Sequence, residues 1–462
     1  KSNFLLLTSY FLLLTSYFRE AVLGVFVMLE SRELAAHEQA MEILNHLAAS
    51  LNIVTISRIK GFINEELLRQ ALDIIQSRHP LLNARIIAKS NSFWFAAGAD
   101  KITLSVKNKQ HIKEWEEVVI EELNQKINSD EYLLRILLIR IEGEENICYL
   151  ITTIHHAIAD ASSCIQLHSE ILTNYQKISE GKVQDTVNKL TQLPSIYKLI
   201  PQPIKSLTGQ ISNILYLLRL KLQLLRYKPI TVGFERSVAL ESRSCGMVHK
   251  KLGSEFTIRF LEICRQQKTT VQAALGAAIL FAVARKNNNQ RKNNYFSFRS
   301  SVNLRSRLQP QISSENLGAV TSTILSFHKV QVKDNFWDLA RDIKLKLEKG
   351  LANGEAFKHL FVFKSIMKYF LKNPHQPTVS AALTNIGRIN IPHNYGQLEL
   401  EEISFVPSQA AFGGVFAAAV STFREQMLLN FMFSQPSISY ETVENMADDM
   451  ISLIIDVCNQ KQ

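Results

Sequence analysis

The chain has 462 residues, of which 52 are Lys or Arg and 42 are Asp or Glu, and its net charge is +10. Its 46% apolar and 20% charged content is typical of a globular protein and excludes a disordered or fibrous one. The length exceeds what one ordinary core organises, so we expect two domains of about 200 residues each. No zinc-finger spacing, RNP-like aromatic motif or long Lys/Arg run is present, so we expect no nucleic-acid partner. The five scattered cysteines, mostly in apolar surroundings, predict reduced thiols in a cytoplasmic protein.

The first 28 residues differ from the rest of the chain. The heptad FLLLTSY occupies residues 4–10 and is repeated unchanged at residues 11–17. The uncharged run over residues 4–18 is shorter than the roughly 20 residues that a membrane span needs. We therefore expect residues 1–28 to be a leader without a structural role.

Residues 29–185 mix helical and extended patterns. The spacing predicts helices at 38–47 and 64–78, the second capped by Asn64, and strands at 53–61, 93–97 and 135–141. This mixture predicts a mixed α/β (α+β) fold.

The most informative stretch of the chain is ICYLITTIHHAIADASS at residues 147–163. Residues 148–154 predict a buried strand, and Asp160 stands where the N-cap of a following helix is expected. His155 and His156 therefore fall where the strand passes into the helix. Imidazole titrates near neutral pH, so a histidine placed there can act as a general base and then as a general acid.

Simpler roles for these residues remain open. His156 could be a core histidine satisfied by one backbone bond, Asp160 could only cap the helix, and His155 could only orient the loop. A zinc site made of His155, His156, Asp160 and His168 is the remaining alternative. No HExxH or CxxC accompanies them, so we expect no metal.

Residues 186–245 predict a linker, because prolines interrupt them and one leucine-rich basic helix, at 211–227, lies among them. That helix could contact a membrane surface or lipid, or could pack as a connecting helix on the domain seam, which we favour. Residues 246–462 predict a second domain. It includes a buried helix at 271–285, after a Thr269/Thr270 cap, and strands at 296–303 and 428–433.

The run HHAIAD resembles the HHxxxD motif of the chloramphenicol-acetyltransferase-like superfamily. That superfamily includes nonribosomal peptide condensation domains, plant BAHD acyltransferases and polyketide-associated acyltransferases. Three further pieces are similar to the phthiocerol dimycocerosyl transferase and alcohol acetyltransferase types: RHPLL at 78–82, VNLRSRL at 302–308 and TNIGR at 384–388. The similarity runs from Arg32 to the C-terminus. Ala161 stands where these relatives commonly have glycine, from which we expect a slightly narrower channel.

The resemblance implies two chloramphenicol-acetyltransferase-like domains that form a V-shaped pseudo-dimer around a central tunnel. It implies that His156 is the general base beside His155, and that Asp160 pairs with Arg305. Asn303 and Ser163 are expected to support the site. Candidates for the oxyanion or substrate contacts are Asn385, Thr384 and Gly387.

The implied activity is transfer of an acyl group from a thioester to the hydroxyl of a small-molecule alcohol. The co-substrate would be acyl-CoA or the phosphopantetheine thioester of an acyl carrier protein, with no permanently bound cofactor. We expect a cytoplasmic monomer that could also contact a membrane surface. The alternatives are a free-standing condensation domain that forms an amide and a non-catalytic scaffold that binds a carrier or a lipid.

Overall fold

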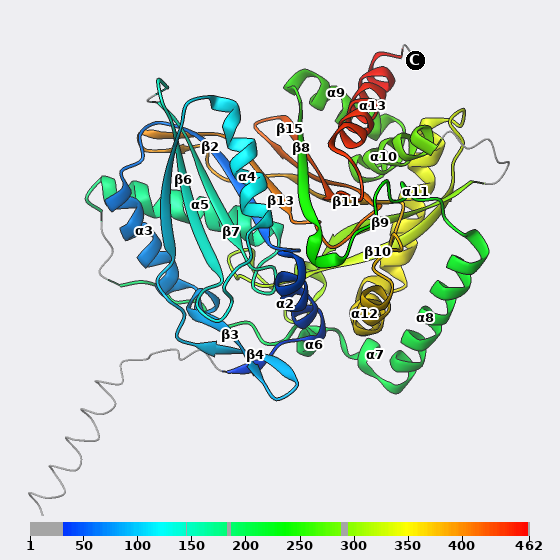
Figure 1. The fold of residues 1–462 in the computed structure, drawn as a ribbon, viewed down its shortest axis with the longest axis horizontal. Helices are drawn as coiled ribbons and strands as arrows, with labels where there is room; N and C mark the ends of the chain where they lie inside the picture. Colours follow the sequence, from blue (N-terminus) through cyan, green and yellow to red (C-terminus); the bar gives the residue numbers. More distant parts are fainter. Residues whose placement is uncertain (1–30, 145, 183–185, 288–293, 461–462) are drawn as a thin grey trace, which may run out of the picture.

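The computed structural model describes residues 31–144, 146–182, 186–287 and 294–460, so the expected leader at 1–28 lies outside the described residues. Two six-stranded sheets stand side by side, each with its own helices, and a small three-stranded sheet lies below the first (Figure 1). The mixed α/β class and the two-part architecture that we expected are therefore present.

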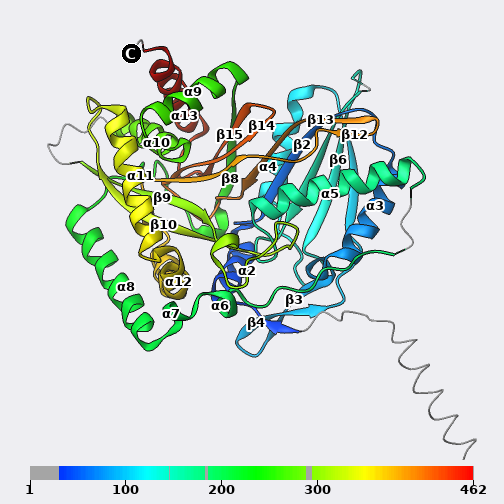
Figure 2. The same ribbon diagram turned by 180° about the vertical axis from the view of Figure 1, so that it is seen from behind.

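The first sheet consists, in spatial order, of β12 (Asn394–Tyr395), β13 (Leu398–Pro407), β2 (Ile53–Lys60), β7 (Ile147–Ile154), β6 (Leu134–Ile141) and β5 (Thr103–Lys109). All neighbours are antiparallel except β5 and β6. Helices α3 (Glu65–Arg78) and α5 (Ala161–Ser179) cover one face, and α4 (Trp115–Asn124) packs on the other, toward the second sheet (Figures 1 and 2).

The second sheet has the order β10 (Thr321–Lys329), β9 (Tyr295–Asn303), β11 (Ala381–Arg388), β14 (Phe416–Phe423), β15 (Gln426–Gln435) and β8 (Ser244–Leu252). Strands β9, β11 and β14 are parallel neighbours, and the other pairs are antiparallel. The helices beside this sheet are α9 (Ser254–Gln266), α10 (Val271–Asn287), α11 (Phe336–Ala352) and α13 (Tyr440–Asn459).

The two sheets do not coincide with the two expected domains. Strands β12 and β13 belong to the segment 246–462, yet they extend the first sheet, where β13 pairs with β2. The side chains of Leu400 and Ile403 on β13 are buried in the core of the first sheet. The C-terminal segment therefore crosses over and completes the sheet of the N-terminal half. A domain boundary placed near residue 246 does not describe this crossover.

The remaining elements connect or buttress the halves. The small sheet contains β1 (Arg32–Glu33), β4 (Ser92–Ala97) and β3 (Ala84–Lys89), and α2 (Ala36–Ala48) follows β1. The linker forms α6 (Ile196–Leu199), α7 (Gln202–Lys205) and α8 (Leu207–Tyr227), and α12 (Glu355–Lys372) packs against both α8 and α2.

Our expectation for the basic linker helix is wrong in one respect. Helix α8 does not lie on the seam between the halves, because its main contacts are with α7 and α12 at the outer edge of the second half (Figures 1 and 2). In the part of the chain that the structure describes, no helix combines the length and apolarity that crossing a bilayer requires.

Local signals explain why the elements form where they do. The Asn64 side chain accepts the N–H groups of Glu66 and Leu67 at 2.9 and 3.1 Å, which starts α3 as predicted. The Thr270 hydroxyl accepts the N–H of Ala273 at 3.2 Å at the start of α10, a helix whose small apolar side chains are buried nearly throughout. All five cysteines are buried and free.

Candidate active site

The histidine motif lies in a tight loop between β7 and α5, as the sequence predicted. His155 directly follows β7, and its carbonyl oxygen accepts the N–H of Ile158 at 3.0 Å. Asp160 is the N-cap of α5: its Oδ1 accepts the N–H and the hydroxyl of Ser163, both at 2.9 Å. The Ser163 hydroxyl in turn accepts the N–H of Asp160 at 3.0 Å. This reciprocal cap fixes the end of the loop.

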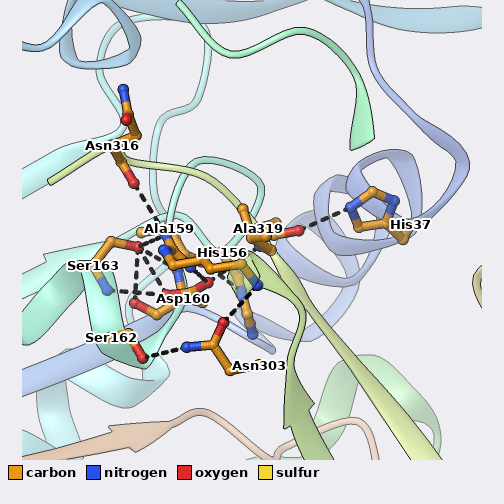
Figure 3. Close-up of polar contacts among 11 residues, drawn as sticks. His37, His156, Ala159, Asp160, Ser162, Ser163, Asn303, Asn316 and Ala319 are labelled. Atoms are coloured by element: carbon orange, nitrogen blue, oxygen red, sulfur yellow. Dashed lines mark hydrogen bonds and ion pairs between the residues drawn. The ribbon is translucent and has the colours of Figure 1, made fainter. Parts of the chain in front are cut away.

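One backbone bond sets the chemical state of His156. Its Nδ1 lies 2.7 Å from the carbonyl oxygen of Ala159, which can only accept, so Nδ1 carries the proton (Figure 3). In the neutral ring Nε2 is then an unprotonated acceptor, the form that a general base requires. Burial lowers the pKa of His156, against the opposing effects of the Ala159 bond and the Asp160 charge, so the neutral form is favoured.

A cavity of about 160 Å³ adjoins His156. Its wall comes from both halves of the molecule: the loop and the start of α5 on one side, and β9, β10 and β11 on the other. The polar side chains that line it include His156, Asp160, Ser162, Ser301, Asn303, Thr384 and Asn385. The cavity therefore lies where the two halves meet, with the histidine at its wall.

His155 is held differently and is not among the residues that line this cavity. It is fully buried, and its Nδ1 accepts the N–H of Ala157 at 3.1 Å, so the ring proton is on Nε2. That nitrogen lies 2.8 Å from Oε2 of Glu42 on α2. The Ser129 hydroxyl donates to the other Glu42 oxygen at 2.5 Å. His155 thus anchors the loop to α2.

Asp160 and Arg305 form the buried ion pair that the resemblance implied (Figure 3). Arg305 Nη1 donates to Asp160 Oδ2, which also accepts the N–H of Val320 at 3.2 Å. Arg305 Nη2 donates to the Ser163 hydroxyl at 3.2 Å and to the Asn316 carbonyl oxygen at 3.0 Å. Because Asp160 is fully buried among these donors, its carboxylate is a structural group that joins the two halves.

Asn303 supports the same junction from the end of β9. Its Oδ1 accepts the N–H of Arg305 at 2.9 Å, and its Nδ2 donates to the Ser162 hydroxyl at 3.2 Å (Figure 3). Asn303 and Ser162 therefore bridge the two sides of the cavity directly.

The three candidates on β11 fall into different positions. Thr384 and Asn385 line the cavity, and the Thr384 hydroxyl is 2.8 Å from that of Ser301. Asn385 Oδ1 accepts the N–H of Gly387 at 2.8 Å, so its Nδ2 is the end that can donate to a ligand. Gly387 is different, because its N–H is used in that bond and it does not line the cavity. The Gly387 N–H is thus already engaged within β11, and Gly387, with φ of +72°, stands where the register of β11 against β14 shifts.

The alternative metal site is not assembled. His168, its fourth expected member, lies 2.7 Å from the Ser57 hydroxyl and 2.8 Å from the Thr152 hydroxyl, one on each ring nitrogen. Within the described residues, no three His, Cys, Asp or Glu side chains are grouped as metal ligands.

Comparison with known proteins relates each part of the chain to a family. The condensation-domain family model matches residues 39–192, and the model of the phthiocerol/phthiodiolone dimycocerosyl transferase C-terminus matches residues 241–435. Together the two models span most of the chain, which belongs to the condensation/chloramphenicol-acetyltransferase-like superfamily. A search of curated proteins found none that matches this chain.

Solved structures share the fold of this chain over nearly its full length. The trichothecene 15-O-acetyltransferase from Fusarium sporotrichioides has a TM-score of 0.75 and 15% identity, covering 92% of this chain and 95% of its own. Polyketide synthase associated protein 5 from Mycobacterium tuberculosis has a TM-score of 0.66 and 16% identity, with 94% and 99% covered. The first condensation domain of the CDA synthetase has a TM-score of 0.71 and 11% identity, with 93% and 96% covered.

Two residues on α2 that lie near the histidine loop were not predicted from the sequence. One of them, Glu42, lies against His155. Burial would raise the pKa of Glu42, but its interactions with His155 and Ser129 lower it further, so the pKa is below its ordinary value. His37 is buried, with Nε2 3.3 Å from the Ala319 carbonyl oxygen, and is close enough to His156 for their charges to interact (Figure 3). Helical spacing gives no sign that these polar residues point inward toward a loop more than 100 positions later.

Proposed function

We propose that this protein is an acyltransferase that moves an acyl group from a thioester to a hydroxyl, with His156 as the general base. The observation that carries the proposal is the Nδ1–H bond to Ala159, which leaves an unprotonated Nε2 at a cavity shared by both halves. The family membership supports acyl transfer as the reaction class. The similarity to an enzyme named as an O-acetyltransferase favours an alcohol acceptor.

The reaction would proceed in two steps. The acceptor hydroxyl gives its proton to His156 Nε2 while its oxygen attacks the thioester carbonyl carbon, and a C–O bond forms. The tetrahedral oxyanion is then stabilised by hydrogen-bond donors, for which Asn385 Nδ2 is our candidate. When the carbonyl re-forms, the C–S bond breaks and the departing thiolate takes the proton back from His156.

The neighbouring residues have positioning roles in this proposal. Asp160 is saturated by its cap and by Arg305, so it holds the loop and does not exchange protons with the substrate. His155 holds the loop from the opposite side through Glu42. The acyl donor would be acyl-CoA or the phosphopantetheine thioester of an acyl carrier protein.

The test is acceptor-dependent thiol release from a panel of acyl-CoAs of graded length and from acyl-loaded carrier protein. Alcohol and amine acceptors are offered separately. We expect release with an alcohol, and a loss of about 10²–10⁴-fold in His156→Ala. His375→Ala is the matched control, because His375 does not line the cavity and its ring meets the exposed hydroxyl of Ser237.

The other outcomes separate the alternatives. Near-normal turnover by His156→Ala would overturn its assignment as the base. Release with amines alone would indicate a condensation domain that forms amides. Absence of release with every donor and acceptor would indicate the non-catalytic scaffold.

A further inference from the structure

Helix α8 carries a continuous apolar stripe that no other part of the described chain covers. Six large apolar side chains on it are between 50% and 70% exposed: Ile211, Ile214, Leu215, Leu218, Leu222 and Leu225. Their spacing of three and four residues places them on one face of the helix. From first to last they extend over about 21 Å at 1.5 Å per residue. Single exposed leucines are common on protein surfaces, but a continuous stripe of this length on one face is not.

The opposite face of α8 is already occupied by the protein. Asn213 and Leu220 are buried there, and Tyr227 stacks on Tyr295 with ring centroids 4.5 Å apart. Arg219 lies 3.5 Å from Glu355 on α12. The helix is also capped, since the Ser206 hydroxyl accepts the N–H of Gly209 at 3.2 Å. Helix α8 is thus seated on the second half by one face and directs its apolar stripe outward.

The figures show where α8 lies in the molecule. Helix α8 forms the outer edge of the second half, on the side away from the first sheet (Figures 1 and 2). It is also remote from the cavity, none of whose lining residues belongs to α8. The stripe is therefore not part of the proposed active site.

The charges around the stripe have one sign. Lys221 and the cap residue Lys228 lie along one border of it, and Arg219 and Arg226 lie along the other, as helical spacing places them. Residues 186–234 contain seven Lys or Arg and no Asp or Glu. An apolar face bordered by basic side chains is the pattern of a helix that lies in the interface of an anionic bilayer.

The same charges disfavour a second copy as the occupant. If two copies packed stripe to stripe, parallel or antiparallel, the Lys and Arg side chains beside one stripe would face those beside the other. Helix α8 has no acidic residue to offset this repulsion. Lipid phosphates have the opposite sign and would meet each border. We propose that α8 docks this protein on an anionic bilayer surface, with its apolar stripe at the boundary of headgroups and acyl chains. This inference does not depend on the proposed acyltransferase activity.

Vesicle co-sedimentation of the full chain tests the proposal. We expect binding to 3:1 phosphatidylcholine/phosphatidylglycerol vesicles that is at least about tenfold weaker with pure phosphatidylcholine and falls as salt is raised. Two variants separate the apolar and the charge contributions. The stripe variant combines Leu218→Ser, Leu222→Ser and Leu225→Ser. The charge variant combines Lys221→Glu and Arg226→Glu, which reverses the charge beside the stripe. Each should lose at least about tenfold in vesicle affinity. The control is Leu345→Ser with Val332→Ser, which alters similarly exposed apolar residues outside α8 and should bind as the wild type does.

Thiol release measured without vesicles should be unchanged in all three variants, which separates this test from that of the active site. Absence of binding to the anionic vesicles, or binding that the stripe variant retains, would overturn the proposal. So would a wild-type dimer by light scattering that becomes monomeric in the stripe variant and does not bind vesicles, because a second copy would then cover the face.

Discussion

The backbone of one loop holds the two adjacent histidines in opposite tautomers. His155 accepts a backbone N–H at Nδ1 and has its Nε2 2.8 Å from Glu42 Oε2, whereas His156 donates from Nδ1 to a carbonyl oxygen. Because each tautomer is set by the backbone group that the ring meets, the loop conformation determines which ring can accept a proton. Of the two, His156 is the one that combines an unprotonated Nε2 with a position at the cavity wall.

The pKa of His156 leads to a prediction at the residue scale. Burial lowers this pKa, and the base works only in its neutral form, so the protonated form should appear only at acidic pH. We expect kcat/KM to rise with pH through an apparent pKa below about 6.5 and to be level at neutral pH. The measurement is the pH profile of thiol release under subsaturating acceptor, with His375→Ala as the control. An acidic limb above pH 7 would contradict this prediction.

At the scale of elements, the sequence pattern predicted those helices and strands that are determined by residues close together in the chain. The N-cap at Asp160, the buried strand before His155 and the capped helix after Asn64 all depend on neighbours within four residues. The crossover of β13 onto β2 depends on pairing between segments more than 300 residues apart, and no local pattern encodes it. Glu42 was missed for the same reason. For α8 the pattern predicted an amphipathic basic helix but could not tell which face the protein would cover.

The pairing of β13 with β2 suggests a test at Gly61, the residue that directly follows β2. Gly61 has φ of +122°, and a Cβ there would lie 2.8 Å from both the Gln397 carbonyl oxygen and a Leu398 methyl group. Gly61→Ala should therefore lower the free energy of unfolding through both backbone strain and a clash, by about 2–4 kcal/mol. Urea unfolding measures the change.

Gly143→Ala is the matched control for strain alone. Gly143 also has a positive φ, of +82°, but no atom lies within 4 Å of the position that a Cβ would take there. Its substitution should cost about 1–2 kcal/mol. Equal losses in the two variants would show that the approach of β13 to the end of β2 does not constrain this position.

At the scale of the whole molecule, the site is made by joining two halves that each contain a sheet. The crossover of β12 and β13 is one link, and the Asp160–Arg305 ion pair is a second, beside the cavity. The second link starts at the cap of α5, next to the histidine loop, and ends just beyond β9. The cavity lies beside this second link, because its wall includes Asp160 on one side and Asn303 on the other. Separation of the halves would therefore open the cavity and release the loop together.

Removal of Arg305 should test this coupling most directly. Arg305→Met leaves the fully buried Asp160 carboxylate without its cation, which should cost about 3–5 kcal/mol in the free energy of unfolding and sharply lower kcat/KM. Asp160→Asn combined with Arg305→Met removes both charges, so its loss of stability should be smaller than the sum of the two single losses. Because the aspartate acts by positioning, the double variant should still show the acidic limb of His156 in its residual activity. Additive losses, or an Arg305→Met variant as stable as the wild type, would show that the pair does not hold the halves together.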